Sequence, residues 1–164
     1  MPGFGMLLMC GAAMAAGDDC KPVFDAMNKV TMTPTRIFST TTNAGKPETN
    51  EILYNGDVIY VSDKGKWSRS PATVQQVAKQ DQEDRNKSKY TCRYLKDESV
   101  DGETAVVYVT HAESPDQKSD GQMSISKNNG LPLRNEIDVT PAGKKIKTHY
   151  SVRYDYKNID PPKL

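Results

Sequence analysis

The sequence predicts an α+β fold, in which a curved antiparallel β-sheet forms a half-open barrel with two helices on its concave face. Apolar and polar residues alternate from Lys145 to Tyr156 and from Leu131 to Thr140, and Pro141-Ala142-Gly143 is a turn signal between these segments. Further turn signals, such as Asn55-Gly56, separate other β-favouring segments. Short turns between consecutive strands predict an antiparallel meander.

The N-terminal residues have the composition of a signal peptide. Met6 to Ala16 is a short apolar segment that contains Ala13-Met14-Ala15, the small-residue spacing that signal peptidases require. This segment is too short to span a bilayer. We expect residues 1–16 to be a signal peptide cleaved near Ala15 or Ala16, and residues 17–164 to form one periplasmic domain. A buried N-terminal helix is the alternative interpretation.

The charge of the chain argues against a nucleic-acid-binding protein, and its cysteines predict a disulfide. The 22 basic and 21 acidic residues are interspersed and give a net charge of +1, which disfavours nucleic-acid binding. Cleavage of the signal peptide removes Cys10 and leaves Cys20 and Cys92. An even pair of cysteines in an exported chain predicts one disulfide. Two unpaired buried thiols are the alternative.

The first half of the domain contains both predicted helices. Apolar residues recur at three- and four-residue spacing within Pro22 to Met32, which predicts a helix that caps the core. A second helix is expected over Ala72 to Lys87, with Ser70 as its N-cap and Pro71 at its first position. Its apolar stripe is narrow, so it should lie on the surface or form a mobile lid. We interpret its acidic residues as a solvated face; these are Asp81, Glu83 and Asp84.

The remaining segments favour strands and loops. Besides the C-terminal hairpin, strands are expected over Thr35–Thr42, Glu51–Tyr54, Val58–Val61, Lys66–Arg69, Tyr90–Lys96, Glu103–His111 and Gln122–Lys127. Polar loops are expected over Asn43–Asn50 and Ser114–Gly121.

Several of these segments together resemble the LolA-like superfamily of exported bacterial proteins. The resembling segments are Gly65–Pro71 before a helix, the hairpin from Val100 to Tyr108, Ser126–Arg134, and Tyr154–Pro162. That superfamily includes periplasmic lipoprotein carriers, lipid-binding mycobacterial lipoproteins and sensor domains of envelope-stress regulators. The resemblance implies an unclosed, strongly curved sheet with helices that plug its apolar concave side.

An aromatic inner face suggests a ligand cleft, because tyrosines suit a cleft with apolar walls and a wet mouth. The candidate lining residues are Phe38, Tyr60, Trp67, Tyr94, Tyr108, Tyr150, Val152, Tyr154 and Tyr156. A lipid, an acyl chain or a lipidated protein would be the ligand. Ordinary core packing is the competing interpretation for each of these residues.

A basic patch suggests the alternative, an envelope interaction or sensor module without lipid cargo. The patch comprises Lys144, Lys145, Lys147, His149 and Arg153, and it could dock an acidic protein partner or lipid headgroups. An enzyme is a third hypothesis, which the sequence does not favour because no catalytic or cofactor-binding motif occurs. The two histidines, His111 and His149, lack partners at metal-ligand spacing. We therefore predict no cofactor and no metal.

Overall fold

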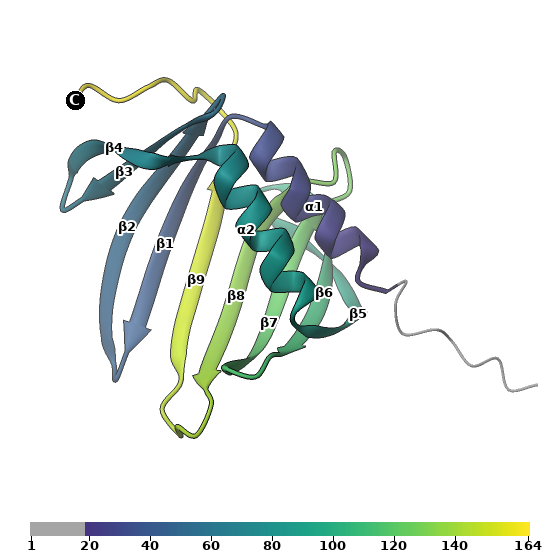
Figure 1. Ribbon diagram of the computed structural model, residues 1–164. Coiled ribbons are helices and arrows are strands. Elements are labelled where there is room, and N and C mark those ends of the chain that lie inside the picture. Colours follow the sequence, from purple (N-terminus) through teal and green to yellow (C-terminus); the bar gives the residue numbers. More distant parts are fainter. Residues whose placement is uncertain (1–18) are drawn as a thin grey trace, which may run out of the picture.

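The computed structural model describes residues 19–164, so the predicted signal peptide lies outside the described residues. Two helices and nine strands make up this part of the chain (Figure 1). The helices are α1 (Lys21–Met32) and α2 (Val74–Asn86). The strands are β1 (Thr35–Asn43), β2 (Lys46–Asn55), β3 (Val58–Asp63), β4 (Lys66–Thr73), β5 (Lys89–Val100), β6 (Glu103–Glu113), β7 (Gln117–Ser126), β8 (Pro132–Pro141) and β9 (Thr148–Asp155).

All nine strands form one antiparallel sheet in the order β4-β3-β2-β1-β9-β8-β7-β6-β5. The sheet is strongly curved and does not close, and both helices lie across its concave face (Figure 1). This confirms the predicted fold class. The strand order departs from a simple meander at one place, because the first strand pairs with the last, joining an N-terminal and a C-terminal group of strands. Helix α2 connects the two opposite edges of the sheet.

The alternation in the C-terminal segment predicts correctly which side chains share a face. In β9, Tyr150, Val152 and Tyr154 stand on the concave face, where Val152 and Tyr154 pack in one apolar cluster with Ile37 of β1 and Val30 of α1. The residues between them in β9 project from the convex face. The strand itself is shorter than its pattern, because residues 142–147 form the loop between β8 and β9.

Two predicted loops are wrong, because most of their residues belong to strands. Lys46–Asn50 pairs with β1, and the turn contracts to Ala44 and Gly45, which both have positive φ. Gln117–Gly121 likewise belongs to β7 and pairs with both β6 and β8. Residues 46–50 are exposed on both faces, so no apolar alternation marks their strand. Backbone pairing with the neighbouring strand determines their conformation instead.

Helix α2 begins later than predicted, because Ser70 and Pro71 belong to β4. Thr73 is the N-cap, and its hydroxyl accepts a hydrogen bond from the backbone of Gln76, whose side chain accepts one from the backbone of Thr73. This capping box was visible in the sequence as a Thr followed by Gln three residues later. The helix begins directly after Thr73 because the two reciprocal hydrogen bonds of the capping box stabilise a start there, whereas Ser70 and Pro71 offer no such pair.

Helix α1 supplies the centre of the core. It buries Val23, Ala26 and Val30, which lie on one side of the helix. Val23 and Ala26 pack with Met123 and Ile125 of β7, and Val30 packs farther along the sheet in the cluster described above. The predicted disulfide between Cys20 and Cys92 is confirmed, and it ties the start of α1 to β5. Within the described residues, no helix combines the length and the apolar character needed to cross a membrane.

Candidate functional site: a cavity beneath helix α2

A cavity of about 240 Å³ lies between the two helices and the concave face of the sheet. Its apolar walls come from Val23 and Met27 on α1, and from Met123 and Ile137 on the sheet. Val23 and Met27 are four residues apart, so they stand on one face of the helix. The rest of the lining comprises Phe24, Asp81, Asp84, Arg85, Tyr90, Thr110, Ser119 and Asn135. The site therefore combines apolar walls with polar side chains from the sheet and a charged side formed by α2.

Two acidic residues of α2, Asp81 and Asp84, line this cavity, which our sequence interpretation did not foresee, although both remain exposed as that interpretation expected. Asp81, Asp84 and Arg85 are spaced three and four residues apart, which places them on one helical face, and all three line the cavity. Partial burial raises the pKa of Asp81; the charge of Arg85 opposes this shift and that of Asp84 adds to it. The spacing was a usable signal, but the sequence alone does not show that this face of α2 turns toward the sheet.

Tyrosines surround this carboxylate on the inner side. Burial raises the pKa values of Tyr54, Tyr90 and Tyr154, and the negative charge of Asp81 contributes to the increase in each. For Tyr154, a hydrogen bond with Asn135 acts in the opposite direction. Tyr90 lines the cavity, whereas Tyr54 and Tyr154 pack in the apolar cluster with Val30; all three hydroxyls stay protonated at physiological pH.

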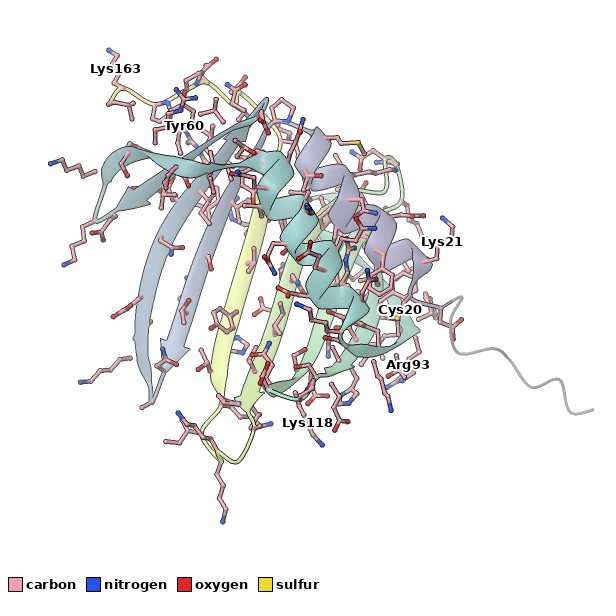
Figure 2. The ribbon with its side chains drawn as sticks, in the orientation of Figure 1. Cys20, Lys21, Tyr60, Arg93, Lys118 and Lys163 are labelled. Atoms are coloured by element: carbon pink, nitrogen blue, oxygen red, sulfur yellow. A yellow bond between two sulfur atoms is a disulfide. The ribbon has the colours of Figure 1, made fainter. Side chains whose placement is uncertain are left out.

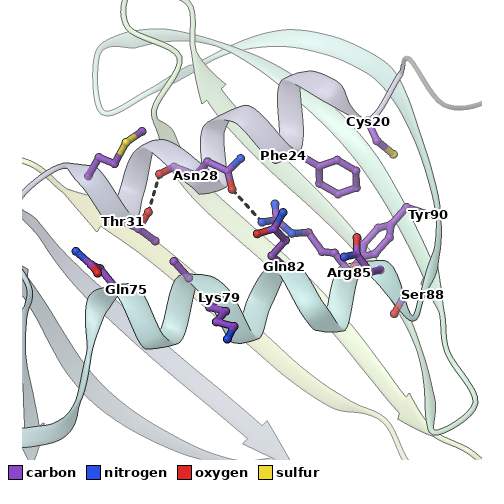
Figure 3. Close-up of a pocket in the computed structure, with 13 residues that line it drawn as sticks. Cys20, Phe24, Asn28, Thr31, Gln75, Lys79, Gln82, Arg85, Ser88 and Tyr90 are labelled. Atoms are coloured by element: carbon purple, nitrogen blue, oxygen red, sulfur yellow. Dashed lines mark hydrogen bonds between the residues drawn. The ribbon is translucent and has the colours of Figure 1, made fainter.

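A wider and more open groove of about 910 Å³ separates the outer sides of α1 and α2 (Figure 3). Arg85 bridges the helices, because its Nη2 donates to Oδ1 of Asn28 at 2.9 Å and its guanidinium lies 5.3 Å from the ring centre of Phe24. Phe24 in turn meets Tyr90 edge to face, with ring centres 5.2 Å apart. These contacts connect the C-terminal half of α2 to α1 at one point.

The structure divides the nine predicted lining residues between two faces. Tyr108, Val152, Tyr154 and Tyr156 pack into the apolar clusters of the core, and Tyr156 also donates to the carbonyl of Pro132 at 2.6 Å. Tyr150 shares the concave face but stands closer to the β8–β9 loop. None of the nine is among the residues that line the 240 Å³ cavity.

The other predicted lining residues lie elsewhere. Phe38 alternates with Ile37 and so faces the convex side, where it stacks against a guanidinium. Tyr60 and Trp67 stand on this same side of β3 and β4, and the Arg36 guanidinium lies 6.0 Å from the Trp67 ring centre. Tyr94 is 57% exposed on the edge strand β5.

The five residues of the predicted basic patch also occupy two different settings. Lys144, Lys145 and Lys147 are exposed together in the β8–β9 loop, whereas His149 and Arg153 project from the convex face of β9. Figure 1 shows this loop at the far end of the sheet from the C-terminal tail.

His149 was predicted to belong to a basic patch, but it lies between two carboxylates, those of Asp138 and Glu136. Its Nδ1 is 2.8 Å from Asp138 and its Nε2 is 3.1 Å from Glu136. Hydrogen bonding to Asp138, and secondarily to Glu136, raises the pKa of His149. The hydroxyl of Ser151 donates to Glu136 and not to the histidine, so this cluster lacks the hydrogen bond by which a histidine base activates a serine.

The second histidine has a similar environment. Nδ1 of His111 lies 2.7 Å from Oδ1 of Asp120, and Asp120 stands opposite Asp138 in the sheet. One row of side chains therefore crosses β6, β7, β8 and β9 on the convex face, in the order His111, Asp120, Asp138 and His149. In residues 19–164, no group of three or more histidine, cysteine or acidic side chains has an arrangement that could hold a metal ion.

Comparison with known proteins gives structural likenesses only. No protein-family model matches the chain, and no curated protein sequence matches it. The crystal structure of MucB is similar to this structure, with 14% sequence identity and a TM-score of 0.49. The match covers 89% of this chain but only 60% of the MucB chain. LprF from Mycobacterium bovis is similar over 86% of this chain and 94% of its own, with 8% identity and a TM-score of 0.44.

A LolA superfamily protein from Nitrosomonas europaea matches 78% of this chain and 86% of its own, with 14% identity and a TM-score of 0.21. These likenesses are too distant to assign a ligand or a partner. The open curved sheet with two helices on its concave side is nevertheless the architecture that the LolA-like resemblance implied.

Proposed function

We propose that residues 17–164 form an exported periplasmic binding protein, without catalytic activity, that shelters an acyl chain or another apolar group beneath α2. The observation that supports this proposal is the cavity itself, which has a mostly apolar lining and is roofed by a polar helix. Met27 and Ile137 in this lining are only partly buried, and exposed apolar surface is unfavourable unless a ligand covers it.

Helix α2 has the properties of a lid. Val74 at its first position is the only buried residue in the helix. Its N-terminus is anchored, because Asp57 accepts hydrogen bonds from the backbone N–H groups of Val74 and Gln75. Its other end depends on the bridge from Arg85 to α1. Displacing the C-terminal half would therefore expose little apolar surface and break few contacts.

Helix α1 is the fixed element of the site. The Cys20–Cys92 disulfide joins it to β5, and the Nζ of Lys29 donates to the carbonyl of Asn129 at 2.7 Å. The disulfide is therefore compatible with opening, since it restrains α1 and leaves α2 to move. It also supports export, because cytosolic thiols are normally kept reduced.

The size of the cavity indicates that the described conformation is a closed one. A volume of about 240 Å³ would hold roughly eight groups the size of a water molecule, at about 30 Å³ each. Ligand sites for larger molecules span about 300–1,000 Å³. A long acyl chain would thus require α2 to move outward, toward the open groove that it shares with α1.

Native mass spectrometry of the protein, exported to an oxidising compartment and purified without detergent, tests the proposal. We expect a mass excess of the size of a lipid that is lost on denaturation. An Arg85→Ala variant should exchange a bound lipophilic dye faster, because it lacks the bridge to Asn28 and Phe24. Arg93→Ala is the matched control, because this arginine of β5 is exposed (Figure 2) and does not line the cavity. A bare mass together with no dye binding would refute the proposal.

A protein-interaction role is the second candidate function, and the β8–β9 loop is the observation that favours it. Lys144, Lys145 and Lys147 are all exposed there, beside Ile146, which is 69% exposed. Charge reversal at Lys145 and Lys147 should remove a partner from pulldowns if this loop docks a protein. An unchanged set of partners would count against this role.

A further inference from the structure

Two arginines stand directly opposite each other on the convex face of the sheet. Arg134 of β8 and Arg153 of β9 are paired in the register of these strands, and both are exposed. Directly opposed residues in a sheet have their Cβ atoms about 4.5–5.5 Å apart, and like charges there destabilise the strand pair. The free protein therefore maintains a repulsive contact that a bound anion would relieve.

Three carboxylates around this pair already have other partners. Asp155, two residues beyond Arg153 on the same face, accepts a hydrogen bond from the backbone N–H of Lys157. Glu136 accepts from Ser151 and contacts His149. Glu98 accepts from Ser124 and forms an ion pair with Lys96; its pKa is lowered mainly by the Ser124 bond and least by the charge of Arg134.

Every ion pair found in residues 19–164 takes a lysine or a histidine as its cation. The arginine pair thus carries two charges that no carboxylate in the described part of the chain neutralises by direct contact.

One of the two guanidinium groups is held in a defined orientation. The Cζ atom of Arg153 lies 4.1 Å from the ring centre of Phe38 on the neighbouring strand β1. Stacking uses the flat face of the guanidinium and leaves its N–H edge free to donate two parallel hydrogen bonds. A guanidinium that is already oriented loses less side-chain entropy when it binds a carboxylate.

We infer that Arg134 and Arg153, with Phe38 beneath Arg153, form a docking site for an acidic segment of a partner protein. A carboxylate placed between the two guanidinium groups would accept charge-assisted hydrogen bonds from both. The site lies on the convex face, so it is independent of the cavity beneath α2. Binding there would leave the lid free.

The charges around the pair favour a narrow peptide segment over an anionic membrane. Glu136 lies two residues from Arg134 on the same face, and Asp138 and Asp120 follow in the next row across the sheet. Residues two apart along a strand are separated by only about 6.5–7 Å. A flat anionic bilayer would meet these carboxylates and be repelled, whereas one extended acidic segment can contact the arginines alone.

Fluorescence anisotropy with the full, oxidised protein and a labelled octaglutamate peptide at low ionic strength tests this inference. The Arg134→Gln/Arg153→Gln variant should bind at least about tenfold more weakly, since a hydrogen bond to a charged group contributes more than tenfold in affinity. The control is Lys46→Gln/Lys66→Gln, which removes the same charge from two exposed lysines of β2 and β4 and should bind within about twofold of the wild type.

Thermal unfolding of the single variant Arg134→Gln supplies a second readout. This variant should unfold at the same temperature as the wild type or higher, because it removes the repulsion and keeps the contact between Arg153 and Phe38. A lower unfolding temperature would indicate that the pair stabilises the fold and would overturn its assignment as a docking site. Equal loss of peptide binding in both variants, or no wild-type binding, would overturn it as well. Arginine-dependent binding to phosphatidylglycerol vesicles without peptide binding would assign the surface to lipid instead.

Discussion

Nδ1 of His149 lies 2.8 Å from Oδ1 of Asp138 on the adjacent strand, and its other ring nitrogen faces Glu136. Carboxylate oxygens accept hydrogen bonds, so both contacts are satisfied only when both ring nitrogens carry a proton. The geometry therefore selects the imidazolium form. This agrees with the raised pKa of His149, whose largest cause is the bond to Asp138.

The first prediction concerns this histidine and pH. A pKa above the ordinary value of 6.5 means that the stabilisation is fully present below about pH 6.5 and is lost as pH rises through the folded-state pKa. Titration of the ring protons by NMR should give a midpoint above 6.5, and Asp138→Asn should lower it. If the midpoint is the same in the wild type and in Asp138→Asn, Asp138 is not the cause of the raised pKa of His149.

The second prediction concerns Asp81 in the cavity. Its pKa is raised above the ordinary 3.8, so ionisation disfavours the folded state, and this destabilisation appears as pH rises through the folded-state pKa. Asp81→Asn should therefore raise the unfolding temperature at neutral pH and have little effect below about pH 3.5. Glu83→Gln, on a residue that does not line the cavity, is the control. The same shift at both pH values would rule out an electrostatic origin.

The disulfide supplies the third prediction. The bond closes a loop between positions 72 residues apart, which corresponds to about 4 kcal/mol on the chain-entropy model. Replacing Cys20 and Cys92 by serine should lower the free energy of unfolding in urea by about 2–4 kcal/mol. Treating this variant with a reductant should then change nothing further, whereas the wild type should lose a similar amount on reduction.

The fourth prediction addresses the N-terminal anchor of α2. Thr73→Ala removes the side chain of the capping box and should cost the helix about 1 kcal/mol. Hydrogen exchange should become faster in α2 and stay unchanged in α1, because the disulfide and the buried residues hold α1 independently. Thr49→Ala, on an exposed threonine of β2, should leave both helices unaffected. Faster exchange in both helices would show that they open as one unit.

Local patterns in the sequence were sufficient for the fold class, for both helices and for the face of each β9 residue. Period-two alternation places Val152 and Tyr154 on the same side whatever the strand pairs with, because side-chain direction along a strand is a local property. The number of cysteines, together with the expectation that Cys10 is removed, was likewise sufficient to predict the Cys20–Cys92 bond. Where neither face is buried, as in residues 46–50, the same pattern is missing and the strand was not predicted.

Only the tertiary structure decided which residues meet across the sheet and beneath α2. The pairing of β1 with β9 joins residues more than a hundred positions apart, and no local signal encodes it. That pairing stacks Phe38 on Arg153, while the register of β8 and β9 opposes Arg153 to Arg134. The packing of α2 places Asp81 and Asp84 at the edge of a mostly apolar cavity, although both side chains remain exposed to solvent. The sequence determined the faces of the elements, because periodicity is local; the partners of each face depend on long-range packing and register.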